Sequence, residues 1–236
     1  MNAISAICAP LQVPQALKIG GCEAVTDLYD CLSPHISYVV APMIETAYAA
    51  RKYVSAVTKV TGASTTPPDF LLNIETNTSF NNIESILEEC SQSPLIRGVV
   101  FGRVDYTFSL GLDRDSISSE RVSKDVLKAA QFAKDYNLDF VVGGAISADS
   151  KELLQNLASV HLTRFETRKC VFDSSLLDST YFEEVLRKAV RFELLWLQSK
   201  KNFYESLSNE DSSRIEMLSR RHVYGLSDGC SKIGLV

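Results

Sequence analysis

The sequence lacks the residue groupings that mark several large classes of protein. Its six cysteines stand singly, without the Cys-x-x-Cys pairs of a zinc site or the density of a secreted disulfide scaffold. It has no basic run with interleaved aromatic residues and a net charge of -5, so we expect no nucleic-acid partner. No apolar stretch approaches the roughly 20 residues needed to span a bilayer. These absences predict a soluble, cytoplasmic protein without a membrane partner.

Two common catalytic arrangements are also missing. The sequence contains no phosphate-binding loop of the Gly-x-x-x-x-Gly-Lys type. Of the three histidines, His35 and His161 precede predicted strands and His222 lies in a predicted terminal helix. None is well placed as a catalytic base, so a Ser/His/Asp or Cys/His nucleophile system is unsupported.

What the chain does contain is an alternation of short apolar runs with longer amphipathic segments. This pattern is typical of repeated βα units around a parallel sheet, and 236 residues suffice for one α/β barrel. Six strands rich in Val, Ile, Leu or Phe are predicted, over residues 15–19, 37–42, 69–75, 96–102, 138–144 and 164–171. Apolar residues at helical spacing predict helices between them, for example over 47–60, 80–90 and 119–136. The predicted fold is therefore a TIM-type (β/α)8 barrel, incomplete at the N-terminus.

The C-terminal part is predicted to be helical. One long helix is expected over residues 181–204 and a second over 211–222, followed by a loosely ordered tail over 223–236. We predict a single domain, with the barrel over residues 1–207 and the last helix and tail over 208–236. These helices complete the fold or form a contact between subunits of a homo-oligomer.

Three predicted strands are followed by a carboxylate in similar surroundings, namely Glu45, Glu75 and Asp105. Consecutive members are thirty positions apart (45 to 75 and 75 to 105), about one βα unit. Since parallel strands all point the same way, residues just past their ends gather on one rim, where such folds place their active sites. We expect the three carboxylates to share that rim.

A shared rim would crowd the carboxylates, because neighbouring strands are only ~4.8 Å apart. A divalent cation relieves the repulsion, and oxygen ligands without Cys or His favour Mg²⁺ or Mn²⁺. We therefore predict that Glu75 and Asp105 bind the metal. In the alternative interpretation each acid and its neighbouring Thr only cap the following helix.

Other candidate groups lie at strand ends. Arg168 or Lys169, in the closing part of the strand predicted over 164–171, is a candidate for binding a substrate carboxylate or phosphate if its side chain points toward the carboxyl ends of the strands. An exposed basic residue at a strand end is also often simply solvated. Paired glycines follow two strands, at Gly20-Gly21 and Gly143-Gly144. Such pairs allow close backbone approach to a ligand, but they also serve as ordinary turn residues.

Four segments resemble the HpcH/HpaI aldolase and citrate lyase beta-subunit family. They are Leu-Lys-Ile-Gly-Gly-Cys-Glu-Ala (17–24), Val-Ala-Pro-Met-Ile-Glu-Thr (40–46), Leu-Asn-Ile-Glu-Thr (72–76) and Gly-Val-Val-Phe-Gly-Arg-Val-Asp-Tyr-Thr-Phe-Ser-Leu-Gly (98–111). The resemblance extends over residues 18–170. The most specific part is the Glu-Thr strand end followed one unit later by Gly-x-x-Asp-x-x-x-Ser-Leu-Gly.

The resemblance implies a TIM barrel that binds Mg²⁺ or Mn²⁺ through Glu75 and Asp105. Members of the family make or break a carbon–carbon bond next to a carbonyl, with a 2-oxo acid or an acyl-CoA thioester as substrate. The metal acts as a Lewis acid that stabilises an enolate. In this sequence Lys18 stands where the family usually has an Arg that holds the substrate oxyanion.

These residues complete the predicted site. Lys18 is the expected oxyanion partner, and Arg103 or Arg168 is the expected anion clamp. Gly20, Gly21, Glu45 and Gly102 are expected to bind substrate, with Glu45 as a possible second group around the metal. A phosphoenolpyruvate-handling mutase or lyase would use the same acid pair.

The family's first two strands have no counterpart in this sequence. The chain is therefore expected to be a fragment of a longer protein or a short form whose open sheet edges are covered by another chain. The second functional hypothesis is thus a truncated, non-catalytic barrel that serves as a structural or interaction module.

Overall fold

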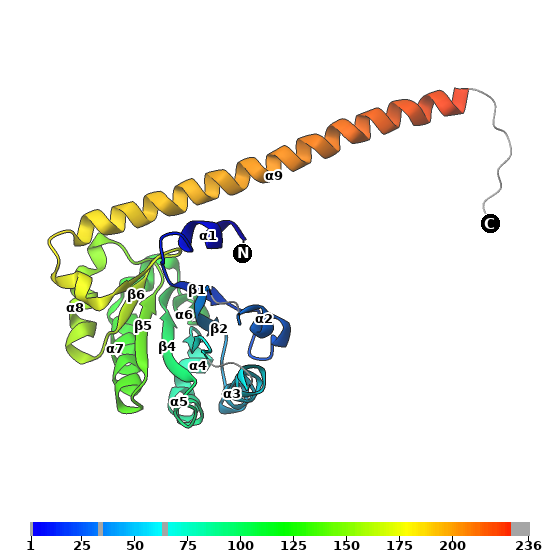
Figure 1. Cartoon of the computed structure of the whole chain (residues 1–236). Helices are drawn as coiled ribbons and strands as arrows, with labels where there is room; N and C mark the ends of the chain where they lie inside the picture. Colours follow the sequence, from blue (N-terminus) through cyan, green and yellow to red (C-terminus); the bar gives the residue numbers. More distant parts are fainter. Residues whose placement is uncertain (1, 33–34, 63–65, 228–236) are drawn as a thin grey trace. The chain divides into compact units, whose positions relative to one another are not determined.

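The computed structural model describes residues 2–32, 35–62 and 66–227 (Figure 1). The chain divides into two compact units, Met1–Ala189 and Val190–Val236. The first contains the sheet with its covering helices, and the described part of the second is the continuation of one long helix. Among the described helices, none combines the length and the apolar character that crossing a membrane requires.

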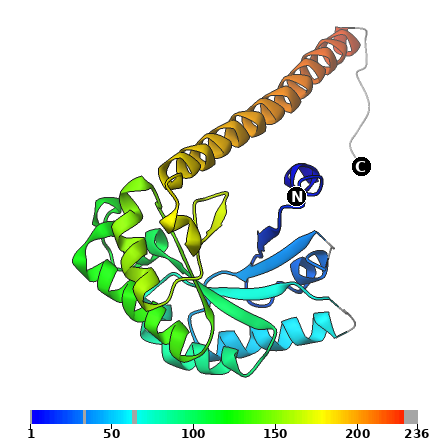
Figure 2. The same cartoon turned by 60° about the vertical axis from the view of Figure 1, so that its left-hand side comes forward.

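Seven strands form one sheet, and they lie in it in chain order. They are β1 (Gln15–Lys18), β2 (Ile36–Ala41), β3 (Asp69–Ile74), β4 (Ile96–Gly102), β5 (Asp139–Gly143), β6 (Arg164–Glu166) and β7 (Val171–Asp173). Strands β1 to β6 are parallel, and β7 pairs antiparallel with β6. The sheet curls, but within the described residues β1 and β7 remain unpaired edges (Figure 2). The chain therefore forms an incomplete α/β barrel.

Helices connect the strands and lie on the outer side of the curled sheet (Figure 2). The α-helices of this unit are α1 (Asn2–Cys8), α2 (Val25–Asp30), α3 (Ala47–Thr61), α4 (Asn77–Asn81), α5 (Ile83–Ser91), α6 (Arg103–Ser109), α7 (Glu120–Asp135) and α8 (Lys151–Val160). Helices α3, α4 and α7 begin where the side chain of Thr46, Thr76 or Ser119 accepts a hydrogen bond from a free backbone amide. Short 3-10 helices cover Arg114–Ser118, Ala148–Ser150 and Ser174–Asp178.

Alternation along the strands separates two faces of the sheet. The outer face carries the large core beneath the helices, including Val39, Phe70, Leu72, Val99, Phe101, Phe140, Val142 and Phe165. Burying each Phe or Leu side chain stabilises the fold by about 1.5–3 kcal/mol. The inner face holds a small cluster of Leu71, Val100 and Val141 with Tyr38 and Val40. Polar residues occupy the rest of the inner face near the strand ends.

The prediction of one strand over residues 164–171 is wrong in part. The segment forms two short strands, β6 and β7, which run antiparallel. The Thr167 amide donates to the Cys170 carbonyl at 2.9 Å and closes the turn between them. Because the chain reverses after Glu166, the residues that follow do not extend the parallel sheet.

The predicted break in the C-terminal helix is also wrong. Helix α9 (Phe182–Ser227) is continuous over 46 residues, so the helix also includes residues 223–227 of the predicted tail; residues 228–236 lie outside the described part. The segment contains no proline, and its only glycine is Gly225. Ion pairs between residues four apart support the helix: Glu183–Arg187, Glu184–Lys188, Lys201–Glu205 and Glu216–Arg220.

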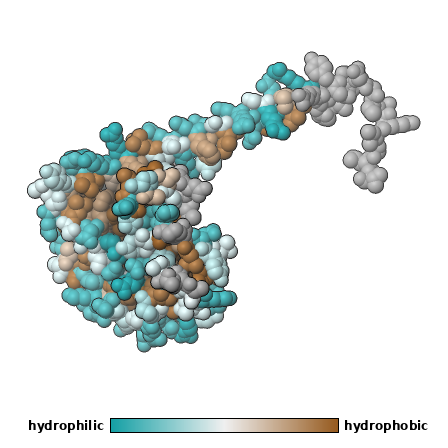
Figure 3. All heavy atoms as spheres, in the orientation of Figure 1, coloured by the Kyte–Doolittle hydropathy of each residue, from teal (hydrophilic) through white to brown (hydrophobic). Residues whose placement is uncertain are grey.

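Hydrophobic side chains are exposed along the Val190–Val236 unit, which Figure 3 shows as brown spheres among hydrophilic ones. They include Val190, Leu194, Leu195, Leu197, Phe203, Ile215 and Leu218. Charged side chains alternate with them. The described helix of this unit therefore has no core of its own.

Candidate active site

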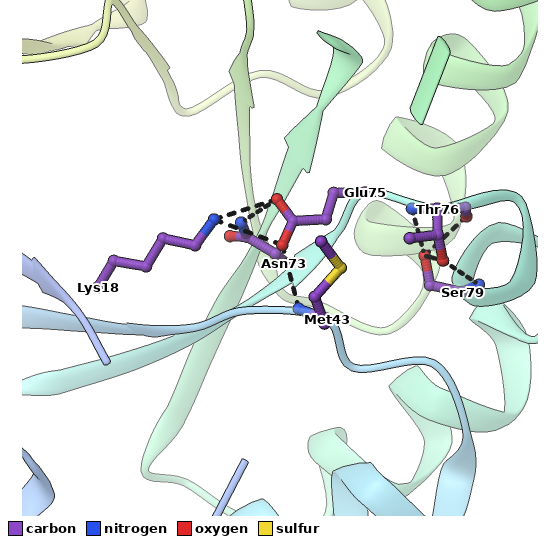
Figure 4. Close-up of polar contacts among 6 residues, drawn as sticks. All are labelled: Lys18, Met43, Asn73, Glu75, Thr76 and Ser79. Atoms are coloured by element: carbon purple, nitrogen blue, oxygen red, sulfur yellow. Dashed lines mark hydrogen bonds and ion pairs between the residues drawn. The ribbon is translucent and has the colours of Figure 1, made fainter. Parts of the chain in front are cut away.

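Glu75 is the most constrained ionisable group at the carboxyl ends of the strands. It follows β3 directly and is only 1% exposed. Its carboxylate accepts hydrogen bonds from Asn73 Nδ2 at 2.7 Å, from the Met43 backbone amide at 3.1 Å and from Lys18 Nζ at 3.2 Å (Figure 4). A buried carboxylate requires such donors to remain charged. The sequence-predicted residues Lys18 and Glu75 therefore meet, although they come from β1 and the end of β3.

The loop after β2 is shaped to reach Glu75. Met43 has a φ of 52°, in the left-handed region that costs a non-glycine residue about 1–3 kcal/mol. In this conformation its amide donates to Glu75 Oε1. The strained backbone at Met43 thus orients the Glu75 carboxylate.

The threonines after the acids cap helices, as the alternative interpretation proposed, but Glu75 itself does not. Thr76 forms a capping box with Ser79 at the start of α4 (Figure 4). Thr76 Oγ1 also donates to Glu45 Oε1 at 2.7 Å. Glu45 therefore contacts the residue next to Glu75 and lies on the same rim, where it supports the loop after β3.

Asp105 lies in the first turn of α6, one βα junction after Glu75. Its side chain is exposed, and within the described residues no hydrogen bond to its carboxylate occurs. The two predicted metal ligands thus follow adjacent strands, β3 and β4, as the parallel order requires. One is buried and fixed, and the other is open to solvent.

A pair of glycines lies between the ends of β3 and β6. Gly102 of β4 and Gly143 of β5 are register partners. A Cβ atom added at Gly102 would lie 2.9 Å from Glu75 Cβ, and one added at Gly143 would lie 2.6 Å from Glu166 Oε1. Each glycine therefore makes room for a carboxylate from the neighbouring strand. Gly102, predicted to bind substrate, has this role toward Glu75.

Sequence analysis did not single out Glu166 as a site residue. Its neighbour Phe165 is fully buried on the outer face, so alternation directs Glu166 to the inner face beside Gly143. Burial, opposed by the charge of Lys18 and reinforced by that of Glu75, raises the pKa of Glu166 to about 7. The repeated pattern of an apolar residue, Glu and Thr, at 74–76 and again at 165–167, could have revealed it.

Arg103 is buried rather than open to the rim. It is 1% exposed, and its guanidinium donates to the Gly144 carbonyl at 2.7 Å and to the Ala145 carbonyl at 3.4 Å. Burial without a carboxylate partner lowers its pKa to about 10. Gly144 and Ala145 both have positive φ, 90° and 51°. Arg103 thus holds the loop after β5, and its predicted contact with substrate stays a prediction.

The remaining predicted residues follow strands β1 and β6. Arg168 and Lys169 are exposed in the turn between β6 and β7. Gly20 follows β1, and its amide donates to Asp27 Oδ2 at 2.7 Å, while a Cβ atom at Gly21 would meet nothing within 4 Å. A side chain at Gly21 would therefore meet open space.

The donor set fits a hard divalent cation that also binds water or substrate. Within the described residues, no cluster of three or more His, Cys, Asp or Glu side chains could hold a metal. Glu75 and Asp105 supply carboxylate oxygens, and Asn73 Oδ1, next to Glu75, is buried without a hydrogen-bond partner. Mg²⁺ is usually bound through one or two protein carboxylates, while waters and substrate supply its other ligands. Lys18 is half-exposed, with a side-chain exposure of 50%, so it can move aside.

Comparison with solved structures identifies the class of fold. The chain is similar to an HpcH/HpaI aldolase from Desulfitobacterium hafniense DCB-2, with a TM-score of 0.54 and 16% identity over 79% of this chain and 76% of that one. It is also similar to a malate synthase from Haloferax volcanii in a lead(II) complex, with a TM-score of 0.58 and 13% identity over 71% and 54%. The fold is that of an α/β barrel.

A further solved structure, the citrate synthase SbnG, matches with a TM-score of 0.55 and 12% identity over 84% of this chain and 77% of that one. Residues 20–173 match the HpcH/HpaI aldolase/citrate lyase family, and the chain belongs to this family. Comparison with curated proteins finds no match. The resemblance inferred from the four sequence segments is thereby confirmed.

Proposed function

We propose that this protein makes or breaks a carbon–carbon bond next to the carbonyl of a 2-oxo acid or an acyl-CoA thioester, with Mg²⁺ or Mn²⁺ as cofactor. Membership of the family supports lyase-type carbon–carbon chemistry in general. The observation that carries the specific proposal is the buried Glu75 carboxylate, oriented by three donors at the end of β3, with Asp105 after the adjacent strand.

Glu75 and Asp105 would hold the cation, and the unpartnered Asn73 Oδ1 is a further candidate ligand. The bound cation would act as a Lewis acid toward a substrate carbonyl. Met43 and Asn73 keep Glu75 oriented through its remaining lone pairs. Lys18, once it leaves Glu75, can place its ammonium against a substrate oxyanion, as a point charge and without the two-pronged contact of an Arg.

Calorimetric titration of the metal-stripped chain with Mg²⁺ and with Mn²⁺ tests the proposal. We expect saturable binding that Glu75→Ala and Asp105→Ala each abolish. Asp115→Ala is the matched control, because Asp115 is an exposed acid in the short helix just after α6. Circular dichroism establishes that each variant is folded.

Absence of binding by the folded wild-type chain would contradict the metal-dependent enzyme and favour the second hypothesis, a non-catalytic barrel module. If binding is found, retro-aldol assays that detect pyruvate and thioester products separate the two substrate classes. A phosphoenolpyruvate-handling enzyme would bind the cation but give neither product.

A further inference from the structure

Two carboxylates face the inner side of the sheet on either side of the Gly102–Gly143 pair. Glu75 packs over Gly102 from β3, and Glu166 packs over Gly143 from β6. The two glycines are neighbours across adjacent strands, ~4.8 Å apart, and one of the two carboxylates occupies the space next to each of them. The strand ends thus form a glycine floor with one carboxylate on each side.

The two carboxylates have different surroundings. Glu75 accepts hydrogen bonds from Lys18, Met43 and Asn73, whereas no described residue donates a hydrogen bond to the Glu166 carboxylate. Glu166 is half-buried on the inner face of the sheet. Fixed donors orient the Glu75 carboxylate, and their lack leaves Glu166 free to gain or lose a proton. Carboxyl pairs with opposed environments commonly divide charge stabilisation and proton transfer between them.

Lys18 joins the two groups electrostatically. It donates to both oxygens of Glu75, at 3.4 and 3.2 Å, and its charge also acts on Glu166. Lys18 and Glu75 are the charged groups of the facing strands that influence Glu166, while Arg164, on its own strand, pairs with Asp139 at the other end of the sheet. The Lys18 ammonium, the hydrogen-bonded Glu75 carboxylate and the Glu166 carboxyl group therefore interact electrostatically beside the Gly102–Gly143 pair.

We propose that Glu166 is the catalytic residue that exchanges a proton with the substrate carbon next to the carbonyl. This inference rests on the proposed function. In the forward step the Glu166 carboxylate takes the proton, the C–H bond breaks, and its electron pair moves into the carbonyl group to form an enolate. The neutral carboxyl group then returns a proton to that carbon in the reverse step, which restores the carboxylate.

The first experiment measures Glu166 directly, without activity. The chain is labelled with [5-¹³C]glutamate, and its carboxyl resonances are followed against pH for wild type, Glu166→Gln and the control Glu88→Gln, which alters an exposed acid of α5. We expect the resonance missing from Glu166→Gln to titrate near pH 7. Titration together with the exposed glutamates, near pH ~4.3, would overturn the proposal.

The second experiment measures proton exchange at carbon. Pyruvate and acetyl-CoA are incubated in D₂O with the protein and Mg²⁺, and loss of their methyl protons is followed by NMR. We expect exchange by wild type that is about 10²- to 10⁴-fold slower in Glu166→Gln and is partly restored in Glu166→Asp.

Calorimetry of Glu166→Gln with Mg²⁺ separates this inference from the proposed function. Unchanged cation binding with slow exchange supports both. Two outcomes would overturn the role of Glu166 alone. In one, Glu166→Gln binds Mg²⁺ and exchanges methyl protons as fast as wild type does; in the other, wild type binds Mg²⁺ but exchanges the protons of neither pyruvate nor acetyl-CoA. Absence of cation binding by the wild-type chain itself would overturn the proposed function. The titration of Glu166 does not depend on the cation and would still be measured.

Discussion

The ammonium group of Lys18 lies 3.2 Å from Oε2 of Glu75, although 57 positions separate the two residues in the chain. Lys18 is half-exposed and Glu75 is buried, with side-chain exposures of 50% and 2%. The pair thus sits at the boundary between the protein interior and the open inner face. A divalent cation and Lys18 would compete for the same carboxylate.

Replacing Lys18 tests this competition. We expect Lys18→Met to bind Mg²⁺ roughly fivefold more tightly in calorimetry, because removing a partly exposed ion pair frees about 1 kcal/mol. The free energy of unfolding should change by less than about 1 kcal/mol, since the pair is solvent-screened on the Lys18 side. Lys52→Met, which breaks an exposed pair with Glu23, is the control. Weaker Mg²⁺ binding in Lys18→Met would contradict the competition.

Removing Glu75 should cost stability in the absence of metal. Glu75→Ala leaves the Asn73 Nδ2 and the Met43 amide without their acceptor, and each unsatisfied buried donor costs about 1–3 kcal/mol. Urea denaturation of the metal-free variants measures the loss. Glu75→Gln keeps one acceptor oxygen and should lose less. Equal stability of Glu75→Ala and wild type would show that the network does not form.

Stability should also depend on pH through Glu166. The ordinary pKa is 4.5 and the folded value is about 7, so between these values the folded state binds more protons than the unfolded state. The contribution of the neutral Glu166 carboxyl group to the free energy of unfolding is fully present below pH 4.5 and is lost as pH rises through about 7. The free energy of unfolding therefore falls with pH in this interval, by at most about 1.4 kcal/mol per pH unit. Urea denaturation from pH 5 to pH 8 should show a flatter dependence in Glu166→Gln; identical slopes would refute the assignment.

The glycine floor makes a separate prediction. Gly143→Ala would place Cβ 2.6 Å from Glu166 Oε1, whereas Gly21→Ala meets nothing within 4 Å. Gly143→Ala should displace the Glu166 carboxyl group and destabilise the fold by about 1–3 kcal/mol. The matched Gly21→Ala change should stay within about 0.5 kcal/mol. Thermal unfolding measures both, and equal melting temperatures would mean that Glu166 does not pack over Gly143.

Arg103 should matter for stability more than an exposed arginine does. Arg103→Ala removes a fully buried side chain and the hydrogen bond to Gly144, a loss of about 2–5 kcal/mol. Arg97 provides the control, because its side chain is 59% exposed and its Nε lies 3.7 Å from Asp69 Oδ1. Arg97→Ala should lower the free energy of unfolding by less than about 1 kcal/mol. Denaturant midpoints compare the two, and a mild Arg103→Ala would remove the structural role assigned here.

Local patterns in the sequence were sufficient to predict the parallel sheet and the placement of Glu75. Consecutive apolar residues identify buried strands, and strand direction alone brings Glu45, Glu75 and Asp105 to one rim. The same reasoning failed at residues 164–171, because a hydrogen-bonded turn at Thr167 reverses the chain. It also predicted a break in α9, where a helix without proline continues through polar residues.

Tertiary structure alone determined which side chains meet. Strand order places β1 two strands away from β3, yet the long side chain of Lys18 reaches Glu75 across the curled inner face. Glu166 acquires its raised pKa from burial and from the charge of Glu75 at the end of β3, against the opposing charge of Lys18 on β1. Such effects depend on distances in space and on exclusion of water, which spacing along the chain does not specify.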